Sequence, residues 1–320
     1  MIRTFRIGLL LLWAGPVFSA PSSVDIETAA RVYQAAAVRE QVRASLGTMP
    51  EQIRQLFARE VSAKLSEQQL AAVTAAAEHG FRIDVFEAPA LAALAQNLDS
   101  VSVAKSEAFL ESDLGRRMVA ADVAAANLGH VKIDKIMDGE LAVPSTPKRD
   151  ALIDQLERAT HSAESTAEVF LSMGRSVAVG TAIGSGQDPA AVDQRVAKSS
   201  EASRAALTGD MREPMRRFLA YAYRDLSDAD LKRLLTFLES PAGKRYVTAY
   251  NASMEAGFDA MGKRTGEQLG ESLRELAQAQ FDNAAENQPP PGIAAPATPA
   301  PATPATPAAP AAPASPAEPR

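Results

Sequence analysis

A nine-residue segment of this 320-residue chain occurs twice. Residues 109–117 read FLESDLGRR, and residues 237–245, which lie 128 positions further on, read FLESPAGKR. When the comparison is extended to residues 109–129 and 237–257, ten of 21 positions are identical, whereas unrelated segments of this composition would share about two. Because shared descent explains this most simply, we expect one structural unit to be present in tandem.

The residues between the two ends of the chain predict an all-α fold. Alanine, leucine, glutamate, glutamine and arginine dominate, and no run of alternating β-branched residues occurs. A capping box at residues 66–69 predicts one helix start. Other starts have a cap residue before a proline, at Thr146-Pro147, Asp188-Pro189 and Ser240-Pro241. Helix ends are expected at three glycines, Gly47, Gly80 and Gly209.

We expect two related helical units, at residues 25–138 and 147–286, each of about the size of an ordinary helical domain. Apolar residues of the second copy repeat at helical spacing, which predicts a buried face formed by Leu231, Leu234, Leu235 and Leu238. Residues 241–286 then read as one long helix or two collinear ones. The later glycines of this segment, Gly257, Gly262, Gly266 and Gly270, weaken a helix by about 1 kcal/mol each unless they permit close packing.

Gly180 and Gly184 form a small-xxx-small pair. In a membrane such a pair would indicate helix pairing, but Glu168 and Arg175 interrupt the apolar stretch. The pair therefore predicts tight helix packing in a soluble core or a flexible helix end.

Residues 1–20 have the layout of a secretory signal peptide. Two arginines precede the apolar run 7–13, which is followed by Gly15-Pro16 and small residues. The run is shorter than the roughly 20 apolar residues that span a membrane. We expect cleavage between Ser19 and Ser22 and export to the periplasm. Lipidation is not expected, because the chain has no cysteine.

Residues 288–320 consist largely of proline, alanine and threonine and hold 12 of the 21 prolines. From Pro301 to Pro319 a proline occurs at every third position, which is the period of a polyproline II helix. Such a segment has almost nothing to bury, so we expect a disordered, low-complexity tail. A periplasm-spanning arm and a ligand for a proline-binding partner are the alternatives.

Residues 226–231 read LSDADL, and with the segment FLESPAGKR at 237–245 they resemble the signature of an exported bacterial helical family, domain of unknown function family 2059. The first copy departs from this pattern at Asp113, where the second copy has Pro241. The second copy is thus the better preserved. The resemblance implies a periplasmic all-helical domain and implies no activity.

Charge and motifs exclude several classes of function. The formal net charge is −6 at pH 7 and basic runs are absent, which argues against nucleic acid or anionic membrane as the main partner. The three histidines, His79, His130 and His161, show no metal-ligand spacing. No nucleophile elbow or phosphate loop occurs. We therefore expect no catalytic residue, no cofactor and no metal.

A basic pair follows each repeated Ser-x-x-Gly, Arg116-Arg117 in the first copy and Lys244-Arg245 in the second. Cations are unfavourable at a helix N-terminus by about 0.3 to 1 kcal/mol each. One interpretation is that nearby glutamates offset the charge or that the side chains extend into solvent. The other is a weak anion site for a carboxylate or phosphate group, formed by these residues and the backbone N–H groups.

These features predict a non-catalytic interaction or scaffold module of the cell envelope, with an unidentified protein or peptide as partner. A holdase-type chaperone is the first alternative, because long apolar helices and a mobile tail suit that role. An enzyme such as a hydrolase without a recognisable motif is the second. The sequence does not predict the oligomeric state.

Overall fold

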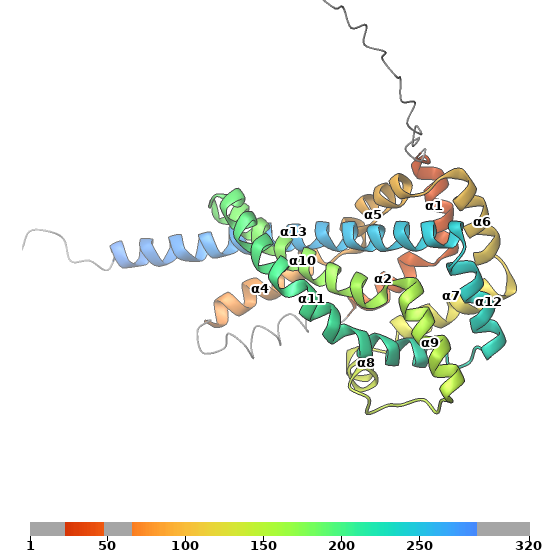
Figure 1. Cartoon of the computed structure of the whole chain (residues 1–320). Coiled ribbons are helices and arrows are strands. Elements are labelled where there is room, and N and C mark those ends of the chain that lie inside the picture. The colour runs from red at the N-terminus through yellow and green to blue at the C-terminus, as the bar shows by residue number, and fades with distance from the viewer. Residues whose placement is uncertain (1–22, 48–65, 287–320) are drawn as a thin grey trace, which may run out of the picture. The chain divides into compact units, whose positions relative to one another are not determined.

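The computed structural model describes residues 23–47 and 66–286, and these residues form twelve helices and no strand (Figure 1). In chain order the helices are α1 (Ile26–Ala35), α2 (Val38–Leu46), α4 (Glu67–Gly80), α5 (Ile83–Asn97), α6 (Ser100–Leu110), α7 (Asp113–Ala126), α8 (His130–Met137), α9 (Pro147–Thr160), α10 (Ser162–Ser185), α11 (Pro189–Ala222), α12 (Asp228–Leu238) and α13 (Pro241–Glu286). The predicted all-α fold is confirmed. The predicted signal peptide and tail lie outside the described residues.

The chain divides into two compact units, Met1–Gln278 and Ala279–Arg320. The helices from α1 to α12 and most of α13 belong to the first unit. Of the second unit, the structure describes only the last residues of α13, where the side chain of Phe281 is 73% exposed. The repeat units expected at residues 25–138 and 147–286 both contribute to the first unit.

Helix starts follow the predicted chemistry. The Ser66 hydroxyl accepts a hydrogen bond from the Gln69 N–H at 3.3 Å, and the Gln69 side chain accepts one from the Ser66 N–H at 2.9 Å. Thr146 and Asp188 cap the helices that open with Pro147 and Pro189. These contacts satisfy N–H groups that have no partner inside the helix.

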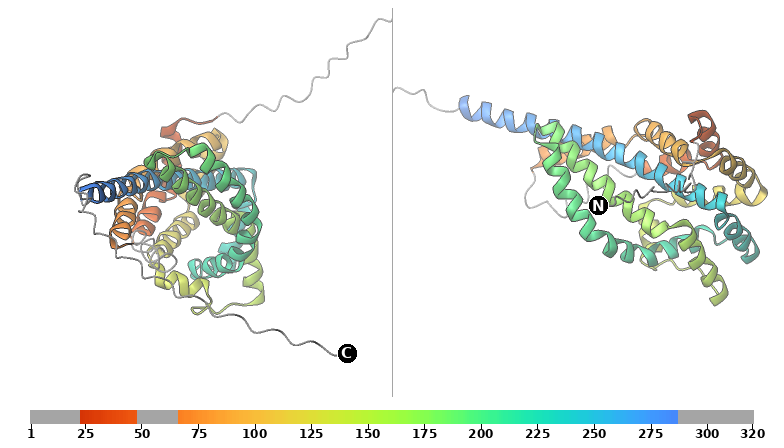
Figure 2. Two further views of the ribbon diagram at one scale, coloured as in Figure 1. Left: turned by 90° about the vertical axis from the view of Figure 1, so that its left-hand side faces the viewer. Right: turned by 45° about the horizontal axis from the view of Figure 1, so that its top comes forward.

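The predicted helix end at Gly209 is wrong, because this glycine lies inside α11. A glycine costs a helix only about 1 kcal/mol relative to alanine. The packing of α11 against α10 along much of its length outweighs this cost, and Figure 2 shows these two helices side by side. Gly47 and Gly80 do lie at helix ends, as predicted.

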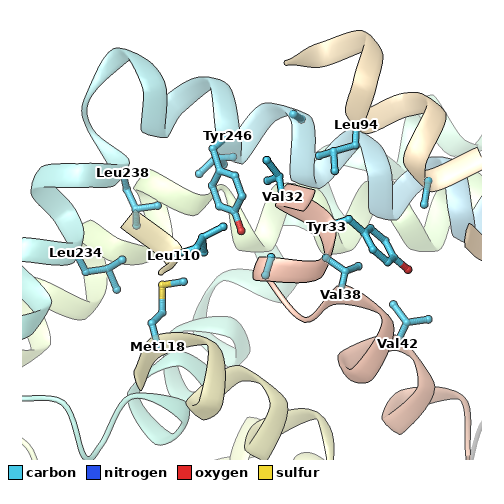
Figure 3. Packing of buried hydrophobic residues seen from close by; sticks show 14 of the residues in the cluster. Val32, Tyr33, Val38, Val42, Leu94, Leu110, Met118, Leu234, Leu238 and Tyr246 are labelled. Atoms are coloured by element: carbon cyan, nitrogen blue, oxygen red, sulfur yellow. The ribbon is translucent and has the colours of Figure 1, made fainter. Parts of the chain in front are cut away.

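One hydrophobic core includes residues from both expected repeat units, among them Val32, Leu110, Leu152 and Leu234. The four leucines of the predicted stripe on α12 are each at most 4% exposed. Figure 3 shows Leu110, Met118, Leu238 and Tyr246 pointing toward one another. These residues form two pairs related by the 128-residue offset, so the core brings the two copies of the motif together.

α13 is one continuous helix of 46 residues, as the first of the two alternatives proposed. Three of its glycines face α10: a Cβ atom on Gly266 would lie 2.1 Å from the Val177 carbonyl oxygen, and one on Gly270 would lie 2.3 Å from that of Thr181. The contact is reciprocal, because a Cβ on Gly180 would lie 2.3 Å from the Lys263 carbonyl oxygen. The small-xxx-small pair of α10 thus serves tight helix packing.

The turn between the paired helices of each copy has the same geometry. Glu111 has φ −79° and ψ −10°, and Glu239 has φ −79° and ψ −12°. The serine that follows accepts a hydrogen bond from the glycine N–H three residues later at 3.0 Å in both copies. A Cβ atom on Gly115 would lie 2.0 Å from the Phe109 carbonyl oxygen, so the turn requires glycine. This steric requirement explains the shared Ser-x-x-Gly spacing.

Equivalent residues of the two copies meet across the core. The rings of Phe109 and Phe237 stack with centroids 3.9 Å apart and planes 5° apart. Contacts between identical positions are what a two-fold relationship between two copies requires. The tandem origin of the copies stays a prediction, and this arrangement is in keeping with it.

Candidate functional site

A cavity of about 470 Å³ lies beside the two copies of the motif, and we call it the central cavity. Its lining comes from α2, α7, α9, α10, α12 and α13 and from residues near the end of α11. On α13, the cavity side chains recur every four residues, at Tyr246, Tyr250, Met254 and Phe258, which places them on one face of the helix. Most lining side chains are apolar.

Equivalent positions of the two copies line this cavity together. Val119 of α7 corresponds to Val247 of α13, and Met118 corresponds to Tyr246. Asp122 corresponds in the same way to Tyr250, so one copy supplies a carboxyl group where the other supplies a phenol. The cavity is therefore formed where equivalent helix faces of the two copies approach each other.

The polar end of the central cavity is centred on Asp122. The Tyr223 hydroxyl donates a hydrogen bond to Asp122 Oδ1 at 2.7 Å, and the Tyr250 hydroxyl donates one to Gln41 Oε1 at 3.2 Å. Tyr246 is 8% exposed and also lines the cavity. Further polar side chains in the lining are those of Thr160, Ser162, Ser165, Thr166 and Asn251.

Burial raises the pKa of Asp122 from 3.8 to about 7, and the hydrogen bond from Tyr223 offsets only part of this effect. Burial also raises the pKa of Tyr250, because a phenolate would be poorly solvated there and close to Asp122. Among the lining residues that the structure describes, Asp122 is the only aspartate, glutamate, lysine, arginine or histidine. At neutral pH, its carboxyl group is therefore balanced between the neutral and the charged form.

The sequence did not single out the central cavity or Asp122. Two helix faces far apart in the sequence form the cavity, and neither face shows on its own that the space between them is left unfilled. One signal was present. When the alignment of the two copies is extended beyond the repeated motif, Asp122 of the first copy aligns with Tyr250 of the second, on otherwise apolar helix faces.

The four residues predicted to bind an anion do not form one site. Arg117 makes a bidentate contact with Asp230, at 2.9 and 3.0 Å, and Arg245 lies 3.7 Å from Asp99. Both acidic residues belong to the start of the first helix of the other copy. Two of the four cations are thus paired with carboxylates rather than directed at a free anion.

The other two predicted residues have different surroundings. The Arg116 guanidinium donates a hydrogen bond to the Glu111 carbonyl oxygen at the preceding turn. Lys244 lines a surface pocket together with Arg158, His161 and Glu239. The anion site stays a prediction, and Lys244 shares its surface pocket with the basic side chains of Arg158 and His161.

A second groove, of about 890 Å³, lies between α10, α11 and α13 and is lined by charged residues. Its charges are largely paired with one another. Arg175 contacts Asp193 through two nitrogens, Arg204 pairs with Glu168, and the Ser172 hydroxyl donates to Asp259 at 2.9 Å. This pairing leaves the groove less suited to a charged ligand than its composition would indicate.

Metal chemistry finds no support in the described residues. Within them, no group of three or more histidine, cysteine, aspartate or glutamate side chains is arranged to hold a metal ion. His79 lies in the last turn of α4, His130 begins α8, and His161 separates α9 from α10. The histidines therefore occupy helix ends.

Comparison with known families identifies part of the chain. Residues 210–271 match the family described as "Uncharacterized protein conserved in bacteria (DUF2059)". The match spans 62 of the 320 residues of the chain. It covers the end of α11, all of α12 and most of α13, and so contains the second copy of the motif and one wall of the central cavity. The predicted resemblance is confirmed there, and its extension to the first copy stays a prediction.

Neither the curated proteins nor the solved structures include a significant match to this chain. None of the helices in the described part of the chain has the length and apolar character needed to cross a membrane. The family match brings no known activity with it.

Proposed function

We propose that this protein is an exported, non-catalytic binding protein that holds a small, largely apolar molecule in the central cavity. The observation that carries the proposal is the cavity itself, about 470 Å³ of space within a core of buried side chains. Ligand pockets in proteins span about 300–1,000 Å³ and combine apolar walls with a few polar groups. The central cavity has this size and this composition.

The periplasm is the proposed location, and the N-terminal sequence supports it. Arg3 and Arg6 precede a short apolar run and a helix-breaking Gly15-Pro16, which is the arrangement that directs secretion. A protein of this location meets small molecules that enter from outside the cell. The proposed role narrows the interaction module expected from the sequence to one with a defined internal site.

A hydrolase is the less favoured proposal, because nucleophilic catalysis needs a hydroxyl or thiol next to a base. The hydroxyl group of Ser162 lines the cavity but has no hydrogen-bond partner among the described residues. Asp122 is hydrogen-bonded to Tyr223 rather than to a serine or threonine. A holdase-type chaperone would require a broad exposed apolar surface, whereas the apolar residues that line this site are buried or half-buried except for Phe170.

A single tryptophan at the cavity tests the proposal. Trp13 is the only tryptophan of the chain, so in a Trp13→Phe background a Phe170→Trp substitution reports on the cavity alone, and we call this protein the cavity reporter. Phe170 lines the cavity and is 53% exposed, which marks it as a tolerant position. We expect 1-octanol to change the tryptophan emission of the cavity reporter in a saturable manner.

Two variants serve as controls. A Phe281→Trp substitution in the Trp13→Phe background, at a position that is 73% exposed and lies outside the cavity, should give a protein that does not respond to octanol. A Ser165→Phe substitution places a large side chain in the lining and should abolish the response of the cavity reporter while the helical circular dichroism is retained. A non-saturable response, or one that Ser165→Phe leaves unchanged, would contradict the proposal. Suppression of client aggregation that is insensitive to Ser165→Phe would favour the chaperone.

A further inference from the structure

The central cavity combines one carboxyl group with no basic group. Its lining residues include Asp122 but no lysine, arginine or histidine. The groups that hold the Asp122 carboxyl in place are neutral, since Tyr223 donates a hydrogen bond to it from the end of α11. A ligand whose polar end is positively charged would therefore meet a negative partner that no cation among the described lining residues already neutralises.

Aromatic rings surround this carboxyl group. Tyr223, Tyr246 and Tyr250 line the same end of the cavity, and the rings of Tyr246 and Tyr250 lie 6.0 Å apart at 40°. The faces of aromatic rings attract cations, and clusters of such rings recognise ammonium groups. Met118 and Met254 add polarizable sulfur to the neighbouring wall.

Resting on the proposed function, we propose that the ligand of the central cavity is an organic cation, an amine with an apolar body whose ammonium group pairs with the Asp122 carboxylate among Tyr223, Tyr246 and Tyr250. The apolar body occupies the part of the cavity lined by Leu156, Leu234 and other aliphatic side chains. An anionic ligand such as a fatty acid would meet a like charge at Asp122 with no basic group to offset it.

The pairing couples binding to pH. The titratable groups that face Asp122 are the phenols of Tyr223, next to α11, and of Tyr246 and Tyr250 on α13, and α2 presents the neutral Gln41. None of these phenols ionises near neutral pH, since burial raises the pKa of each. Asp122 is thus the group that must be ionised to pair with the ammonium group of the ligand. Because the ionised fraction of Asp122 grows with pH, an amine binds more tightly as the pH rises from 5 to 8.

Three ligands of eight carbons each, which differ in the charge of the polar end, test the charge class: octylamine, 1-octanol and octanoate, each titrated into the cavity reporter at pH 5 and pH 8. At pH 8 we expect octylamine to bind at least about tenfold more tightly than octanol and octanoate more weakly than both. The advantage of octylamine over octanol should shrink at pH 5. These pH profiles use the unaltered carboxyl group and need no further substitution.

Asp122→Asn in the cavity reporter provides the second arm. It should remove the preference for octylamine over octanol and the pH dependence of that preference. If octanol or octanoate binds the cavity reporter as tightly as octylamine, or if Asp122→Asn retains the preference, the amine inference is overturned and the binding function stands. If none of the three ligands binds, the binding function itself fails, and the inference falls with it.

Discussion

Asp122 and Tyr250 occupy equivalent positions in the two copies of the motif, and the difference between them gives the central cavity its chemistry. The apolar setting that suits a ligand also disfavours an ionised carboxylate. The same residue therefore links ligand binding to the pH dependence of stability. A second acidic residue, Asp230, shows the opposite behaviour, because hydrogen bonds from Arg117, Arg233 and Ser227 lower its pKa.

Asp122→Asn should stabilise the protein at pH 8 more than at pH 4. The folded-state pKa of Asp122 is raised from 3.8 to about 7, so folding binds a proton between these values and stability falls as the pH rises through them. Asparagine removes this loss. We expect the difference in unfolding free energy between variant and parent to grow by about 4 kcal/mol from pH 4 to pH 8. Denaturant unfolding at both pH values measures it.

Asp230→Asn is the matched control with the opposite sign. The lowered pKa of Asp230 contributes stability above pH 4 that is lost as the pH falls through the folded-state value. The variant should therefore be less stable than the parent at pH 7, with a deficit that narrows in strong acid. If both variants show the same pH trend, the environments assigned to the two carboxyl groups are wrong.

Lys244 is the residue on which the predicted anion site now depends, because Arg117 and Arg245 are occupied by Asp230 and Asp99. If the pocket of Lys244, Arg158 and His161 binds anions, phosphate at fixed ionic strength should raise the thermal midpoint of the parent. Lys244→Ala should abolish that increase, whereas Arg116→Ala should leave it intact. An equal response of all three proteins to phosphate would mean that these side chains only extend into solvent.

At the scale of elements, the packing of α10 against α13 depends on glycine. Gly180 and Gly184 on α10 and Gly266 and Gly270 on α13 allow the two backbones to approach more closely than alanine would permit. This packing fixes one side of the central cavity, because α10 supplies Ser165, Thr166 and Val169 to its lining. The glycines that weaken α13 as an isolated helix therefore position it in the fold.

Gly266→Ala should destabilise the protein by about 1–3 kcal/mol, since the added methyl group would lie 2.1 Å from the Val177 carbonyl oxygen and the helices must separate. Gly174→Ala, also in a helix but with nothing within 4 Å of the added atom, should instead stabilise it by about 0.5–1 kcal/mol. Chemical denaturation of both variants measures the contrast. Equal effects of the two substitutions would refute close backbone packing of α10 on α13.

The sequence predicted those parts of the fold that depend on local chemistry. The cap at Ser66, the prolines at helix starts and the long helix from Pro241 follow from short-range patterns, and the structure contains them. Gly209 was misjudged because its helix is held by packing against α10, which no local pattern reports. The central cavity and the pairing of Arg117 with Asp230 were not predicted from the sequence for the same reason, because both depend on contacts between helices that are distant in the sequence.

At the scale of the whole molecule, the two helix pairs that carry the repeated motif, α6–α7 and α12–α13, share one core and leave a cavity beside their contact. Ligand binding and export are the functions proposed for this arrangement. Export with cleavage of the signal peptide predicts the mass of the mature protein. The protein isolated from the cell envelope should have lost 19 to 22 residues and, with them, Trp13 and its fluorescence. Recovery of the intact chain in the cytoplasm would refute it.

The most direct test of ligand binding in the central cavity is a methyl NMR titration of the protein with octylamine at pH 8, using labelled methionine. Met118, Met173 and Met254 line the central cavity, whereas Met211 does not, so the chain contains its own reporters and control. We predict saturable shifts of the three cavity methyl signals, an unchanged Met211 signal, and loss of the shifts in Ser165→Phe. Cavity methyl signals that stay unchanged at saturating octylamine, or shifts that persist in Ser165→Phe, would contradict the account.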